Sequence, residues 1–197
     1  MISLGMHHLT RNDVAQVAAC AARDWLEKHG LHRIAPPIPV KKIAESLGFI
    51  VTYRNLSNPQ ILGFYMHGVI GVNLRNQSHT RGRFSLAHEL GHAVWHPHQR
   101  YTCLNGDLGL LEIEANTFAA ELLMPQADFL HRIAPYRDLG LLSYIDDLAV
   151  VYAVSREAVW WRLADLGIWT RSQVKAQIRH AGLKLSDPVA QQIAPAK

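Results

Sequence analysis

Cysteine, long apolar runs and repeated segments are scarce or absent in this sequence. Its 197 residues include two cysteines, Cys20 and Cys103, whose separation fits neither a disulfide framework nor a zinc knuckle. We therefore expect two reduced thiols, as in cytoplasmic proteins. No apolar stretch approaches the roughly 20 residues that cross a bilayer, and residues 1–10 lack the charged and apolar regions of a signal peptide. The sequence thus predicts a cytoplasmic protein with no membrane segment.

A strong excess of one charge is absent as well. The formal net charge is +4 and the pI is about 9.2, and the basic residues are scattered rather than gathered in a block. Such a chain permits a nucleic-acid partner without predicting one, so direct DNA binding is not expected. A hydrophobic fraction of 49% and a charged fraction of 18% are ordinary for a globular protein, and a chain of this length can bury a core without disulfides.

Apolar periodicity, together with proline and glycine, divides the chain into helices around one short β-region. Residues 13–28 repeat apolar side chains every three or four positions until Gly30 ends the helix. Residues 49–74 contain three strand-like segments, and His67-Gly68 is a good turn between the second and third. The expected strands are 49–54, 61–66 and 69–74, and the expected helices are 13–28, 40–47, 80–96, 111–123, 126–133, two within 141–166 and one over 172–181.

These elements predict an α+β fold that is mainly helical and has a small three-stranded antiparallel sheet. We expect one domain over residues 11–135 and a C-terminal helical segment over 136–183 packed on it. Residues 184–197 are polar and contain proline, so we expect them to form a flexible tail.

The two helices within 141–166 have a spacing like that of a helix-turn-helix. Ser155 is a good N-cap for the second helix. A helix that reads DNA would carry more exposed basic residues than Arg156 and Arg162 supply. We therefore expect this pair to pack on the main domain or to dock a partner protein.

The chemistry of the sequence is concentrated in the run His88-Glu89-Leu90-Gly91-His92. Histidines four positions apart on a helix share one face, and two such nitrogens can bind one Zn²⁺ at about 2.0–2.1 Å. Glu89 follows the first histidine and can take a proton from the attacking water. Gly91 removes side-chain bulk where another element can approach. The alternative is a pair of buried histidines satisfied by hydrogen bonds.

A catalytic zinc usually needs a third protein ligand. Glu112, Glu114 and Glu121 on the next helix are the acidic candidates, and Glu112 shares its face with Asn116, which could orient a ligand. His96 continues the spacing of the first two histidines, but the helix face drifts by about 40° per step, so it is expected beside the site or at the surface. Further candidates, for stabilising an oxyanion, are His98 and Tyr101.

Two runs together resemble the ImmA/IrrE metallopeptidase family. They are Phe84-Ser85-Leu86-Ala87-His88-Glu89-Leu90-Gly91-His92 and Glu112-Ile113-Glu114-Ala115-Asn116-Thr117-Phe118-Ala119-Ala120-Glu121-Leu122-Leu123-Met124-Pro125. Their pairing at this separation is far more specific than the zinc motif alone. The resemblance extends from about Asp13 to Leu166.

This resemblance implies a zincin-like domain with His88, His92 and Glu112 as zinc ligands and Glu89 as the catalytic residue. It also implies a partner, because family members are typically paired with a helix-turn-helix repressor that they cleave to release transcription. Manganese or iron could occupy the same ligand set.

Two hypotheses follow for the function. The first is a zinc endopeptidase that cleaves a helix-turn-helix repressor in a bacterial or phage regulatory switch, with the substrate added as a strand to an edge at 69–74. The second is a non-catalytic, metal-containing regulatory protein, such as an anti-repressor or a toxin–antitoxin component. A structural metal site would not need Glu89 and would close its fourth position with protein.

Overall fold

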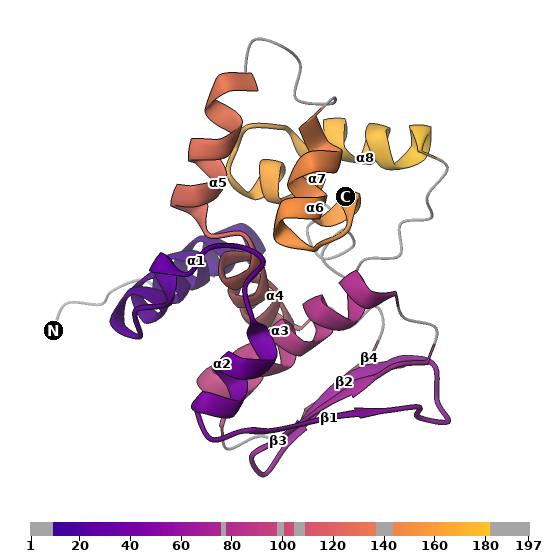
Figure 1. Cartoon of the computed structure of the whole chain (residues 1–197). Coiled ribbons are helices and arrows are strands. Elements are labelled where there is room, and N and C mark those ends of the chain that lie inside the picture. Colours follow the sequence, from indigo (N-terminus) through magenta and orange to yellow (C-terminus); the bar gives the residue numbers. More distant parts are fainter. Residues whose placement is uncertain (1–9, 76–77, 98–100, 105–108, 137–143, 182–197) are drawn as a thin grey trace, which may run out of the picture.

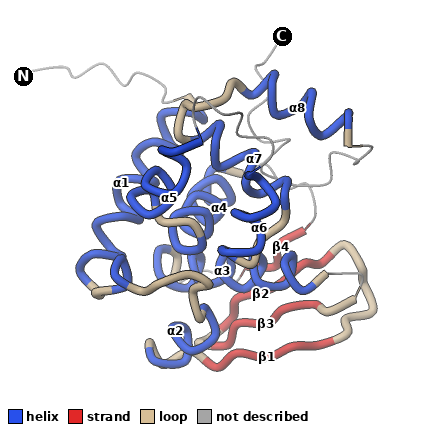
Figure 2. Tube along the Cα trace, turned by 45° about the horizontal axis from the view of Figure 1, so that its top comes forward, coloured by secondary structure: helices blue, strands red, loops and turns tan. Residues whose placement is uncertain are grey.

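The computed structural model of the chain describes residues 10–75, 78–97, 101–104, 109–136 and 144–181. Helices stack on one side of a small sheet (Figures 1 and 2), so the predicted α+β class is confirmed. The elements are α1 (Arg11–Lys28), η1 (Leu31–Arg33), α2 (Val40–Ser46), β1 (Ile50–Arg54), β2 (Ile61–Met66), β3 (Val69–Asn73), α3 (His79–Trp95), β4 (Tyr101–Leu104), α4 (Leu110–Leu123), α5 (Gln126–Ile133), η2 (Ala134–Tyr136), α6 (Ile145–Tyr152), α7 (Arg156–Asp165) and α8 (Arg171–His180).

The sheet differs from the predicted three antiparallel strands. Its order is β1-β3-β2-β4, and β2 is antiparallel to both of its neighbours, whereas β1 is parallel to β3. After β1, the chain places β2 two positions away in the sheet, and β3 then occupies the position between β1 and β2. The buried side chain of Asn73 holds this connection, because it accepts from Leu56 N at 3.0 Å and donates to Ile61 O at 2.7 Å.

Two expectations about strands are therefore wrong. Residues 69–74 were expected at an edge, but β3 is central, because β1 and β2 both pair with it. No strand was expected after residue 74, but residues 101–104 form β4, which pairs with β2 at an edge of the sheet. Both errors concern pairing between distant segments, which local patterns do not encode.

Helix α3 lies across the sheet, with α4 and α1 behind it (Figures 1 and 2). Gly91 permits the close packing of α3 on α4, as expected: a Cβ there would lie 3.2 Å from both Ala115 Cα and Phe118 Cβ. Ser78 caps the start of α3 by accepting from Arg81 N. Helix α3 thus packs against the sheet on one side and against α4 on the other, and its central turns are buried.

The C-terminal helices α5 to α8 lie at the end of the molecule away from the sheet (Figure 1). Ser155 caps α7 as predicted, by accepting from Ala158 N at 3.1 Å. Most of α7 is buried, including Trp161 and Arg162, which leaves Arg156 as its exposed arginine. This burial agrees with the expectation that the pair α6–α7 packs rather than reads DNA.

The predicted tail at 184–197 and the candidate His98 lie outside the described residues. None of the helices in the described ranges combines the length and the apolar character needed to cross a membrane.

Candidate metal centre

Helices α3 and α4 bring three of the predicted side chains to one buried point. Nε2 of His88 and Nε2 of His92 lie 3.1 Å apart. Glu112 faces both, with Oε2 3.1 Å from Nε2 of His88 and Oε1 3.2 Å from Nε2 of His92. All three residues are buried, and their ligand-type atoms converge as around one ion. The face shared by His88 and His92, with α4 packed against it, produces this convergence.

Asn116 supports His88 from behind. Its Oδ1 lies 2.8 Å from Nδ1 of His88, as the shared face of Glu112 and Asn116 led us to expect. An amide oxygen accepts only, so Nδ1 of His88 donates, and the neutral ring then carries a lone pair on Nε2. That lone pair faces a carboxylate, an arrangement that is repulsive unless a proton or a metal cation lies between them. A His₂Glu set is also a known catalytic zinc set, so these residues fit a divalent metal.

The other candidates for a third ligand lie elsewhere. Glu114 accepts from Nε2 of His96 at 2.9 Å, and Nδ1 of His96 lies 3.1 Å from Nδ1 of His92. His96 therefore contacts His92 on the side of the ring away from Nε2, and Glu114 contacts His96 in turn. Tyr101, a candidate for stabilising an oxyanion, begins β4.

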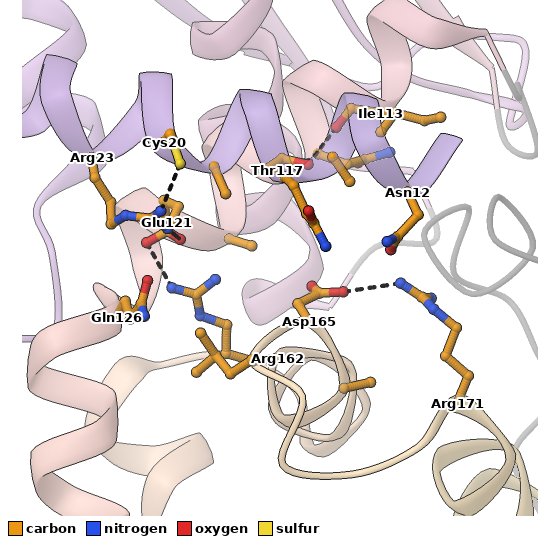
Figure 3. Close-up of a pocket in the computed structure, with 17 residues that line it drawn as sticks. Asn12, Cys20, Arg23, Ile113, Thr117, Glu121, Gln126, Arg162, Asp165 and Arg171 are labelled. Carbon is orange, nitrogen blue, oxygen red and sulfur yellow. Dashed lines mark hydrogen bonds and ion pairs between the residues drawn. The ribbon is translucent and has the colours of Figure 1, made fainter. Parts of the chain in front are cut away.

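Glu121 belongs to a different cluster. Its carboxylate accepts from Arg23 Nη1 at 2.8 Å and from Arg162 Nη2 at 2.7 Å, at the wall of a cavity of about 390 Å³ (Figure 3). Cys20, exposed and free of any disulfide as expected, lines the same cavity. Two guanidinium groups occupy the Glu121 oxygens, so this residue holds α1, α4 and α7 together rather than joining the metal cluster.

Glu89 is fully buried beside the cluster. Its carboxylate lies over the backbone of β2, where a Cβ at position 63 would come within 2.5 Å of Oε1. This role of Gly63 was not predicted from the sequence. A glycine inside a strand, which often marks a close approach of another group, was the available signal.

Burial and the contacts between Glu112 and the two imidazoles shift the pKa values of the cluster in different directions. Burial alone would lower the pKa of His88, but Glu112 and then Glu89 outweigh it and raise that pKa. Burial lowers the pKa of His92 to about 4. Burial would raise the pKa of Glu112, but its contacts with the two imidazoles hold it well below the usual range. The centre is therefore an ionised carboxylate beside two imidazoles, one of them easily kept neutral.

This chain is similar to a phage protein in sequence and to a solved structure in fold. Uncharacterized immunity region protein 2 of Bacillus phage phi105 is 34% identical over 108 residues, which are 50% of this chain and 63% of the phage protein. A Mycobacterium tuberculosis transcriptional regulator has a TM-score of 0.55 at 21% identity, over 78% of this chain and 48% of that one. The chain thus spans under two thirds of either relative, and the second comparison shows a likeness of fold alone.

A family model gives the assignment. The model of the IrrE N-terminal-like domain, peptidase family M78, matches residues 44–164, a range that holds the sheet, α3 and α4. This match confirms the resemblance drawn from the two sequence runs, and the matched range contains the whole candidate centre. The chain therefore belongs to peptidase family M78, a family of metallopeptidases.

Proposed function

We propose that this chain is a zinc-dependent endopeptidase that cleaves a partner protein, with His88, His92 and Glu112 holding the metal and Glu89 as the catalytic residue. The convergence of two imidazole nitrogens and one carboxylate, with a second buried carboxylate alongside, is the observation that carries this proposal. Two histidines and one glutamate are a ligand set that catalytic zinc sites use, with the fourth position taken by water or substrate.

Each side chain has a distinct task in the proposed reaction. A zinc ion at this site would polarise the scissile carbonyl and bring the pKa of water down toward about 7. Glu89 takes a proton from the attacking water on its carboxylate and delivers it to the leaving amine nitrogen. Gly63 leaves the space in which that carboxylate lies. Asn116 holds His88 in the tautomer that presents a lone pair on Nε2 to the metal.

The proposed substrate is a helix-turn-helix transcriptional repressor in a bacterial or phage regulatory switch. The family and the similarity to a phage immunity-region protein support it. Such a substrate would place the reaction in the cytoplasm. An extended substrate segment would pair with β4, because β4 is a sheet edge and pairs directly with β2, which carries Gly63.

The test uses purified, zinc-loaded protein and, as substrate, a helix-turn-helix repressor whose gene neighbours the gene of this protein. Glu89→Gln should retain the metal and slow cleavage by about 10²–10⁴-fold, because the amide cannot take a proton. Glu45→Gln, a change of the same kind at an exposed position of α2, is the matched control and should cleave normally. Cleavage by Glu89→Gln at the rate of the unchanged protein would remove Glu89 from the chemistry.

The same experiment separates the second function. A non-catalytic regulatory protein would bind the repressor and leave it intact, and Glu89→Gln would then regulate in cells as well as the unchanged protein does. Metal content measured on both proteins distinguishes that outcome from simple loss of zinc.

A further inference from the structure

The two imidazoles of the metal centre are supported in different ways. Nδ1 of His88 donates to an amide oxygen, whereas Nδ1 of His92 faces another imidazole, that of His96, at 3.1 Å. The rings of His92 and His96 are tilted by 50°, with their centroids 5.3 Å apart. An imidazole can donate or accept, so the tautomer of His92 depends on what fixes the tautomer of His96.

Glu114 fixes the tautomer of His96. A carboxylate accepts only, so Nε2 of His96 donates to Oε2 of Glu114 across their 2.9 Å contact. Neutral His96 then has a lone pair on Nδ1, and Nδ1 of His92 donates to it. This leaves the lone pair of His92 on Nε2, the atom that faces Glu112 and His88. The carboxylate of Glu114 thus determines which ring nitrogen of His96, and in turn of His92, carries the hydrogen.

The backbone explains how His96 reaches this place. A third histidine at helical spacing would drift around the helix from His88 and His92. His96 is the C-cap residue of α3, with φ −125° and ψ 47°, and its N–H donates to His92 O at 2.8 Å. Residues four apart on a helix are still neighbours, so this spacing brings the ring of His96 beside His92, and the helix ends there, just before Pro97.

We propose that Glu114 and His96 form a hydrogen-bonded relay that fixes the tautomer and orientation of His92 and thereby sets the affinity of the centre for zinc. The relay rests on the proposed function, because it assumes that His92 is a ligand. It runs inward from a partly exposed carboxylate to a fully buried ring: the side chains of Glu114, His96 and His92 are 34%, 8% and 0% exposed. His96 and Glu114 are positioning residues in this scheme and touch neither metal nor substrate.

The choice of substitutions separates hydrogen bonding from charge. Glu114→Gln keeps an oxygen that can accept from His96, so the tautomers and the zinc affinity should stay near those of the unchanged protein. Glu114→Leu removes the acceptor, and His96→Phe removes the bridging ring. Each of these should weaken zinc binding by about 10–100-fold, the usual effect of losing a partner behind a metal-binding histidine. His79→Phe, at an exposed histidine on the same helix, is the control.

The first readout is the zinc dissociation constant of the full-length protein, measured by competition with a chromophoric chelator. The second is the ¹⁵N spectrum of the imidazoles, which reports whether Nδ1 of His92 carries the proton. A merely structural role for Glu114 would lower the melting temperature without moving the proton on His92. Because Glu114 is partly exposed, its two variants keep the test valid even if His96→Phe does not fold.

The outcomes are distinct. Zinc affinities equal to that of the unchanged protein in both Glu114→Leu and His96→Phe would overturn the relay alone. Equal weakening by Glu114→Gln and Glu114→Leu would also overturn it, because charge and not the hydrogen bond would then matter. Failure of the unchanged protein to bind zinc would overturn the relay together with the metal centre. Weakened zinc binding as expected, in a protein that cuts no repressor, would uphold the relay and refute the endopeptidase.

Discussion

The carboxylate of Glu89 fits its position because Gly63, on β2, has no side chain. Its carboxylate is fully buried, and β2 passes so close that a methyl group at position 63 would meet both Oε1 and Cγ of Glu89 at under 3 Å. The same methyl group would lie 2.9 Å from Gly71 O on the next strand. Glu89 and the β2 backbone are therefore fitted to each other, and the position of the proposed base depends on the sheet.

Gly63→Ala should consequently impair catalysis more than metal binding. We expect cleavage to slow by about 10²-fold, the effect of misplacing a catalytic group by about 1 Å. Zinc affinity should change only a few-fold, because His88, His92 and Glu112 lie on other elements. Gly82→Ala is the control, since its Cβ would meet only Val72 Cγ1, at 4.0 Å. Normal turnover by Gly63→Ala would show that β2 does not fix Glu89.

The contacts of the metal centre were predictable from the sequence where the residues lie on one face of the same helix. The spacing of His88 and His92 states that they share a face, and the face shared by Glu112 and Asn116 agrees with the observed contacts. The approach of Gly63 to Glu89 and the contact of His96 with Glu114 depend on tertiary packing between separate elements. No local pattern encodes either of them.

At the scale of elements, the helices and the positions of three strands were predictable, whereas the order of the strands in the sheet was not. Periodicity and capping residues act within one segment, so the expected helix at 126–133 coincides with α5 and Ser155 caps α7. Strand pairing joins segments that are distant in the chain. The return of β3 between β1 and β2, and the addition of β4, therefore had no local signal.

The contact between α5 and α6 makes stability depend on pH. Asp128 Oδ2 accepts from Arg132 Nε at 2.8 Å and from the hydroxyl of buried Tyr152 at 2.7 Å. Burial would raise the pKa of Asp128, but these two hydrogen bonds outweigh it and hold the pKa below its ordinary value. A carboxylate with a lowered pKa in the folded state stabilises the fold above its unfolded pKa of about 3.9, and this contribution is lost as the pH falls through the folded value.

Asp128→Asn should therefore lower the free energy of unfolding at pH 7 by about 1 kcal/mol, a value reduced for the partial exposure of the site. The difference from the unchanged protein should begin to shrink as the pH falls below about 4, where Asp128 of the unfolded chain becomes protonated, and should shrink further as the pH falls through the lower folded value. Urea unfolding at pH 7 and pH 3 measures both values. Asp24→Asn, at an exposed carboxylate of α1, is the control. A difference that is the same at both pH values would contradict this account.

Across the whole molecule, one buried ion pair connects the C-terminal helices to the helix that carries Glu112. Arg162 of α7, 2% exposed, donates to Met124 O at 3.0 Å. It also donates to Glu121 Oε2 at 2.7 Å (Figure 3). Arg23 of α1 donates to the other oxygen of Glu121. A single carboxylate thus links three helices, and one apolar core runs through the main body and the C-terminal helices alike. We propose that residues 136–183 complete the fold of residues 11–135 rather than forming an appendage.

Removal of one partner from this pair should be costly, because it leaves a buried charge without compensation. We expect Arg162→Met or Glu121→Gln to lower the free energy of unfolding by about 3 kcal/mol, toward the lower end of the range for buried pairs since Arg23 remains. The double variant Arg162→Met with Glu121→Met should recover part of this loss, because no charge is then stranded between α4 and α7. Thermal unfolding of all variants, with a double-mutant cycle, measures the coupling.

If the helices beyond residue 135 were an appendage, the fragment 11–135 would melt at the temperature of the full chain and Arg162→Met would not change the zinc affinity. If they complete the fold, the fragment unfolds, and the α3–α4 contact that brings Glu112 to His88 and His92 is lost with it.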